Sequence, residues 1–214
     1  IQVPFDQCPI AIKGDRVKGT GTVTAEITDA PLDITLAQNL RMVREHETTK
    51  VVGTLTAQFQ AERWDAAALT IADLCHYVGD ANQPLHCAKN YDGQLTGNNG
   101  IHSRYESSMV GTYVGQLHTA PMAVQYYASP QDAIFDLIGE SWSGVSPILA
   151  ADNDAKAASG GSYNSTYYAT LWNDTKDLTQ VRMDAASLMT ASYVYTAWVD
   201  AGRPFVPGSS VGVP

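Results

Sequence analysis

Apolar residues recur every three or four positions along most of the chain after residue 30, a spacing that predicts helices. The first predicted helix begins where Thr28 or Asp29 can cap it and Pro31 fits its first turn. Its apolar face comprises Leu32, Leu36, Leu40 and Val43. A second helix is predicted over residues 50–60. Residues 1–27 lack a helical period, so we expect an irregular N-terminal segment with at most a short strand.

The longest apolar stretch predicts a central helix over residues 64–79, because its middle is nearly free of polar side chains. The expected core face comprises Ala68, Ile71 or Ala72, Cys75, and Val78 or Gly79. Pro84 should end this helix, because proline cannot continue the helical hydrogen bonds. The residues from 82 to 100 are rich in turn formers, including Asp92-Gly93 and Asn99-Gly100, and predict a long loop.

The C-terminal half predicts helices over residues 101–117 and 130–149, then a loop near residue 160. A final helix has the most regular spacing, and Gly202 and Pro204 should end it. Its predicted apolar face comprises Leu178, Val181, Ala185, Leu188, Ser192, Tyr195 and Val199. With no internal repeat and no domain boundary, the sequence predicts one compact all-α, multi-helix domain over residues 1–214.

Composition agrees with a folded domain, since hydrophobic residues make up 44% of the chain and charged residues 16%. The formal net charge of −9 argues against stable binding of duplex DNA, which depends on lysine and arginine. It does not exclude a protein that binds phosphate through divalent cations, because bound metal ions invert the local field. No apolar run reaches the length of about 18 residues that predicts a transmembrane segment.

Histidine and carboxylate spacing is the strongest chemical signal in the sequence, which has five histidines. The stretch HYVGDANQPLH contains His76, Asp80 and His86, and IHSRYE contains His102 and Glu106. Residues four apart on a helix share a face, so each His–carboxylate pair can point the same way. Zinc accepts such ligands. His86, His102 and Glu106 could form a three-ligand site with an open position, and His76 and Asp80 part of a second site.

The alternative is that these histidines are hydrogen-bonded core residues without a metal. A single pair would favour that interpretation. Two pairs and a third histidine, in a chain with so few histidines, favour metal binding instead.

The three cysteines could form a disulfide, bind zinc or pack in the core. Cys8, Cys75 and Cys87 allow at most one internal disulfide. Cys75 follows Leu74 on a predicted helix and points about 100° away from His76, which favours core packing over zinc binding. A Cys75–Cys87 disulfide is the alternative.

Other candidate residues carry weaker signals. His118 lies in a predicted loop, where a solvated histidine is favoured over a ligand. Tyr77, Tyr91 and Tyr105 could line a substrate cleft, although tyrosine at this spacing is more often a core residue with a hydrogen-bonded hydroxyl. Arg104 could contact a phosphate or form a surface ion pair.

The pattern H-x3-D-x5-H followed by H-x3-E, in LCHYVGDANQPLH and GIHSRYE, resembles the zinc-dependent phospholipase C family and the related single-strand-specific nucleases of the fungal P-one type. The resemblance covers residues 66–110 and is closest to bacterial members. It implies an all-α enzyme with three zinc ions. It assigns His76 and Asp80 to one zinc, with Asp80 bridging toward another, and His86, His102 and Glu106 to a further zinc. A glutamate at position 106 matches the phospholipase branch, whereas the nucleases generally have aspartate there.

The chain departs from the family at its N-terminus. Family members begin with a tryptophan whose amine binds zinc, followed by a histidine and later an aspartate and a histidine. Here the first residue is Ile1, and no histidine precedes His46. Asp33 and His46 are one candidate for the later pair. The other expectation is that a segment upstream of Ile1 supplies these ligands and the aspartate that orients the water.

The favoured functional hypothesis is a zinc-dependent phosphodiester hydrolase like phospholipase C, with two or three zinc ions and a phospholipid substrate. One alternative is a nuclease and 3′-nucleotidase that acts on single-stranded nucleic acid. Another is a non-catalytic helical protein stabilised by zinc. The resemblance implies a secreted or periplasmic protein.

Overall fold

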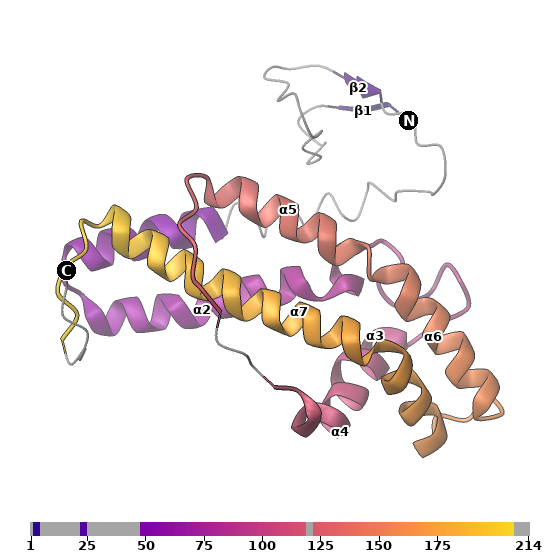
Figure 1. Ribbon diagram of the computed structural model, residues 1–214. Coiled ribbons are helices and arrows are strands. Elements are labelled where there is room, and N and C mark those ends of the chain that lie inside the picture. The colour runs from indigo at the N-terminus through magenta and orange to yellow at the C-terminus, as the bar shows by residue number, and fades with distance from the viewer. Residues whose placement is uncertain (1, 5–21, 25–47, 119–121, 208–214) are drawn as a thin grey trace.

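The computed structural model describes residues 2–4, 22–24, 48–118 and 122–207, and these are all-α apart from one pair of short strands (Figure 1). Strand β1 (Gln2–Pro4) pairs with β2 (Thr22–Thr24) in antiparallel register, with Val3 opposite Val23. The predicted helix after residue 28 lies outside the described residues, as do Asp33, His46 and Cys8. Among the described residues, no helix combines the length and the apolar character of a membrane span.

The helical body consists of elements that the sequence largely predicted. A helix over residues 48–60 is followed by α2 (Trp64–Asn82) and the 3₁₀ turn η2 (Pro84–Cys87). After the loop come α3 (Ile101–Ser103), the π-helical segment η3 (Arg104–Met109), α4 (Val110–Tyr113) and the 3₁₀ turn η4 (Val114–Gln116). The last helices are α5 (Pro130–Trp142), α6 (Val145–Ala158) and α7 (Ser165–Asp200).

Helix α2 forms where the sequence predicts it and ends before Pro84, and the predicted core face is partly wrong: Val78 is buried and Ile71 packs against the core, but Ala68 is exposed. Its buried side chains include Ala67, Leu74 and Val78, whereas Cys75 is exposed and Leu69 is 72% exposed. The middle of this helix has few polar side chains, so periodicity alone could not select the side that packs on α5 and α7. No disulfide joins Cys75 and Cys87.

The region predicted as one helix over residues 130–149 contains two helices, α5 and α6, separated by Ser143 and Gly144. A β-carbon on Gly144 would lie 2.9 Å from the Pro84 ring and 3.2 Å from the Leu178 side chain. The backbone therefore approaches η2 and α7 more closely than another residue would allow. This close approach requires glycine at the junction, and Pro147 in the first turn of α6 lacks the N–H that would continue a single helix.

Helix α7 is longer than the predicted final helix, with 36 residues, and lies along the centre of the body (Figure 1). It begins after Asn164, whose side chain accepts hydrogen bonds from two amides of the first turn. It ends before Gly202, as predicted. The predicted core face is partly wrong, because Val181 is 53% exposed whereas Met189 and Tyr193 are buried.

Two apolar clusters explain this difference, because α7 packs on different partners along its length. The C-terminal half of α7 shares one cluster with α2 and α5, through residues such as Leu74, Ile134 and Tyr193. The N-terminal half shares the other with α3, η3 and α6, through residues such as Ile101 and Ile148. The turn η2 contributes to both clusters and is therefore fixed where they meet.

Candidate metal centre

Three predicted ligands converge on one point between η2 and the helix that follows the loop. The Nε2 atoms of His86 and His102 are 3.2 Å apart. Glu106 Oε2 lies 3.2 Å from the first of these atoms and 3.1 Å from the second. The two imidazole rings are stacked, with centroids 4.8 Å apart. Residues 16 positions apart in the sequence thus present their ligand atoms together.

The contacts behind the two imidazole rings favour hydrogen on Nδ1 of each ring. His102 Nδ1 lies 3.2 Å from the Tyr91 carbonyl oxygen, which can only accept, so this nitrogen is the donor. His86 Nδ1 likewise lies 3.3 Å from Asp80 Oδ1. In neutral rings both Nε2 atoms then present bare lone pairs to each other and to the Glu106 carboxylate. Three mutually facing acceptors require a shared cation or an additional ring proton.

The separations fit a metal ion. Zinc binds histidine nitrogen and carboxylate oxygen at about 2.0–2.2 Å, and tetrahedral geometry places such ligands about 3.3–3.5 Å from each other. The three observed separations between ligand atoms, 3.2, 3.2 and 3.1 Å, are close to these ligand–ligand distances. Orientation of metal-binding histidines by a carbonyl or a carboxylate on the other nitrogen is also typical of metal sites. His86, His102 and Glu106 can therefore bind a metal ion and leave a fourth position open.

The loop before α3 positions His102 through Asp92. The two carboxylate oxygens of Asp92 accept hydrogen bonds from the backbone N–H groups of Gly100 and His102, at 3.0 and 3.3 Å. These amides belong to the first turn of the helix and have no intrahelical partner. Gly100 itself has φ of 80°, a left-handed conformation that favours glycine. Asp92 thus caps the helix from the loop and fixes the backbone beside the ligand.

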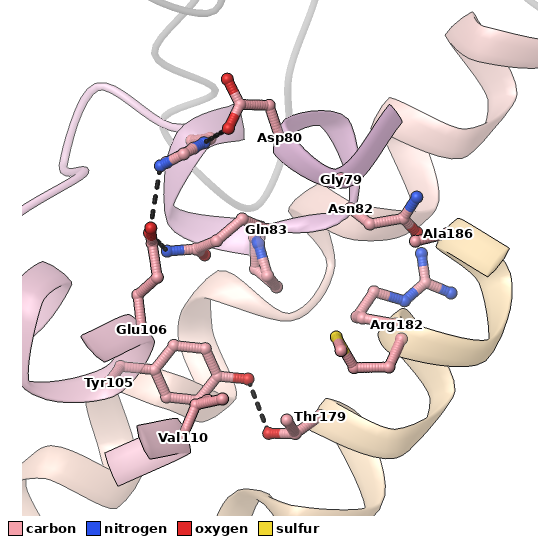
Figure 2. Close-up of a pocket in the computed structure, with 13 residues that line it drawn as sticks. Gly79, Asp80, Asn82, Gln83, Tyr105, Glu106, Val110, Thr179, Arg182 and Ala186 are labelled. Atoms are coloured by element: carbon pink, nitrogen blue, oxygen red, sulfur yellow. Dashed lines mark hydrogen bonds and ion pairs between the residues drawn. The ribbon is translucent and has the colours of Figure 1, made fainter. Parts of the chain in front are cut away.

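Gln83 positions both remaining ligands (Figure 2). Its side-chain Nε2 donates to Glu106 Oε2 at 2.9 Å, and its side-chain Oε1 accepts from the Leu85 backbone N–H at 2.8 Å. One side chain therefore joins the first turn of η2, which carries His86, to the glutamate on η3.

The helix that carries His102 and Glu106 is anchored on its other side by a buried ionic network around Asp152. Arg104 donates from Nη2 to Asp152 Oδ1 at 3.1 Å and from Nε to the Tyr167 hydroxyl at 2.8 Å. Lys156 and Tyr167 also contact the Asp152 carboxylate, which is fully buried. Burial alone would raise the pKa of Asp152, but the hydrogen bonds from Lys156, Tyr167, Asn98 and Arg104 together lower it.

A pocket of about 210 Å³ adjoins the metal ligands (Figure 2). Asp80, His86 and Glu106 line one part of it. Its other lining residues, from α2, η2, η3, α4 and α7, are Gly79, Asn82, Gln83, Pro84, Tyr105, Val110, Thr179, Arg182, Met183 and Ala186. The walls are thus mostly apolar, with the metal ligands at one side.

The other predicted ligands have different positions. Asp80 contacts the Nδ1 atom of His86 and therefore lies beside the cluster of His86, His102 and Glu106. His76 is 71% exposed, and its Nε2 atom is 3.8 Å from Asp80. A second ion held by His76 and Asp80 stays a prediction, and its suggested partners Asp33 and His46 lie outside the described residues.

The weaker candidates divide into core and surface residues. Tyr105 is buried and its hydroxyl contacts Thr179 at 2.9 Å, whereas Tyr91 is 44% exposed and its ring lies edge-on to His102. His118 is exposed, as predicted. Arg104 forms a buried ion pair, so the prediction of a phosphate contact or a surface ion pair is wrong.

Sequence spacing did not identify Asp92, Gln83 or Asp152, because each acts on the centre through a contact distant in sequence. Asp92 was visible only as part of an Asp-Gly turn signal. Neither the protein-family models nor the curated proteins compared with this chain include a match to it.

Proposed function

We propose that this chain is a zinc-dependent phosphodiester hydrolase of the phospholipase C type. The observation that carries the proposal is the convergence of His86 Nε2, His102 Nε2 and Glu106 Oε2 at 3.1 to 3.2 Å beside a pocket. Three protein ligands with an open fourth position are typical of catalytic zinc sites, whereas structural sites are closed by four. The sequence pattern around these residues supports the same class of enzyme.

In this proposal His86, His102 and Glu106 hold the ion. Zinc at this position supplies a Lewis acid that polarises a phosphoryl oxygen and favours ionisation of water near neutral pH. The Tyr91 carbonyl and Asp80 keep the imidazole rings oriented, and Gln83 holds the glutamate. Asp80 also lines the pocket, and in this proposal its carboxylate takes up a proton during hydrolysis.

The pocket supports an organic phosphate ester as the substrate. Its apolar wall, formed by Pro84, Val110, Met183 and Ala186, suits the carbon part of such a molecule. The negative net charge of the chain does not oppose this, because a bound divalent cation would set the local field.

A nuclease that acts on single strands is the second candidate, and the exposed ring of Tyr91 favours it. This ring is edge-on to His102, with centroids 6.0 Å apart, and its free face could stack on a base. Stacking on aromatic rings is the usual means by which proteins hold single-stranded nucleic acid without sequence preference.

The test compares hydrolysis of a short-chain choline phospholipid with that of single-stranded DNA, using the full chain loaded with zinc. The proposal predicts cleavage of one substrate, loss of activity with a chelator and recovery on adding zinc. His102→Ala and Glu106→Gln should abolish activity, whereas His118→Ala, at an exposed position outside the centre, should not. Cleavage of neither substrate by a zinc-loaded chain would overturn the proposal and favour a non-catalytic protein stabilised by zinc.

A further inference from the structure

Arg182 on α7 lines the pocket on the side away from Glu106 (Figure 2). Its side chain is 12% exposed, and its Nε and Nη1 atoms are buried without a hydrogen-bond partner in the described part of the chain. Its Nη2 atom contacts Glu140 at 3.4 Å, a long distance for an ion pair, and that carboxylate is 64% exposed. The guanidinium group therefore has two unpaired donors that are buried beside the pocket.

Unpaired donors of this kind are unfavourable, since a buried guanidinium normally satisfies its N–H groups with carboxylate, phosphate or carbonyl oxygen. Arginine also remains charged at all relevant pH values. Arg182 is the only lysine or arginine among the described residues that line this pocket.

We propose that Arg182 binds the oxyanion of a small phosphate-containing ligand in this pocket. The ligand would lie between the metal ligands on one side and the guanidinium on the other, with the apolar wall around its carbon part. The metal side of this arrangement rests on the proposed function. The arginine side does not, because unpaired N–H donors buried beside a pocket favour an anion whether or not the protein is a hydrolase.

Inorganic phosphate is the probe, and its affinity for the full, zinc-loaded chain is measured by isothermal titration calorimetry. Arg182→Gln removes the charge, and Arg182→Lys keeps it. The matched control is Lys176→Gln, which removes a positive charge from an exposed position on the same helix. We expect Arg182→Gln to weaken phosphate binding by about tenfold to a hundredfold, the loss typical of a hydrogen bond to a charged group. Arg182→Lys should lose less, and Lys176→Gln should bind like wild type.

Two further measurements separate this proposal from a structural role. The zinc content of each variant should equal that of wild type, because Arg182 does not contact the metal ligands. The urea midpoint of Arg182→Gln should be unchanged or higher, since the variant removes buried donors that lack acceptors. A marked loss of stability in both Arg182 variants would overturn the proposal in favour of a structural ion pair with Glu140.

The proposal is also overturned if Arg182→Gln binds phosphate like wild type, if Lys176→Gln weakens binding equally, or if wild type binds no phosphate. Failure of the proposed function is distinguishable from these outcomes. A wild-type chain that binds no zinc, or cleaves no phosphodiester, would refute the hydrolase, while dependence of phosphate affinity on Arg182 would still support the anion site.

Discussion

Replacement of Asp152 by asparagine tests whether the buried ionic network anchors the helix that carries His102 and Glu106. Asp152 is fully buried and contacts Arg104, Lys156 and Tyr167. Asparagine preserves the size of the side chain but removes the negative charge. Both cations then lack their carboxylate, and Arg104, itself 9% exposed, cannot turn easily to solvent.

The magnitude follows from the burial of the pair. Removing one partner of a buried ion pair typically costs about 3–5 kcal/mol, because the remaining charge stays buried without compensation. Arg104 keeps its bonds to the Asn98 and Asn99 carbonyls and to Tyr167, which reduces the loss. Lys156 is less buried than Arg104 and can reach solvent. We therefore expect Asp152→Asn to lower the free energy of unfolding by about 3 kcal/mol.

Urea denaturation followed by circular dichroism measures this loss, with Asp154→Asn as the control. Asp154 lies on the same helix but is exposed, so its substitution should change the free energy of unfolding by less than about 0.5 kcal/mol. A loss below about 1 kcal/mol for Asp152→Asn, or equal losses for the two variants, would refute the anchoring role of the network.

Three further predictions follow from the same contacts. Gln83→Ala should weaken zinc binding about 10- to 100-fold by releasing Glu106; unchanged affinity in competition with a chelator would contradict it. Ile148→Ala, in a fully buried position, should lower the free energy of unfolding by about 2–5 kcal/mol, and a urea curve matching wild type would refute this packing. The pKa of Asp152 is lowered in the folded state. Its contribution to the free energy of unfolding is therefore fully present above the unfolded pKa of about 3.9, and it is lost as the pH falls through the folded pKa. Wild type should therefore lose stability below pH ~4 more steeply than Asp152→Asn, and parallel pH profiles would count against it.

The sequence predicted the helices better than it predicted their faces. Helix α2 was visible from its apolar run and from Pro84, both local signals. Its buried side was predicted only in part, because that side depends on the helices that pack against it. The close approach at Gly144 likewise depends on Pro84 and Leu178, which are distant in sequence.

The metal centre shows the same division. The spacing of His102 and Glu106 on a helix is local, and the convergence with His86 followed from one turn after α2. The contacts that orient these ligands, from Gln83 and Asp92, depend on how the loop folds. Arg182 is 76 residues beyond Glu106, so only the packing of α7 brings it to the pocket. No pattern in the sequence marked it.

The zinc X-ray absorption spectrum of the full chain, loaded with one equivalent of zinc, tests the central claim most directly. We predict a shell of nitrogen and oxygen at about 2.0–2.1 Å, with the multiple scattering of two imidazole rings. His102→Ala should lose the signal of one ring. A sulfur shell at about 2.3 Å, or a spectrum unchanged in His102→Ala, would contradict binding by His86, His102 and Glu106.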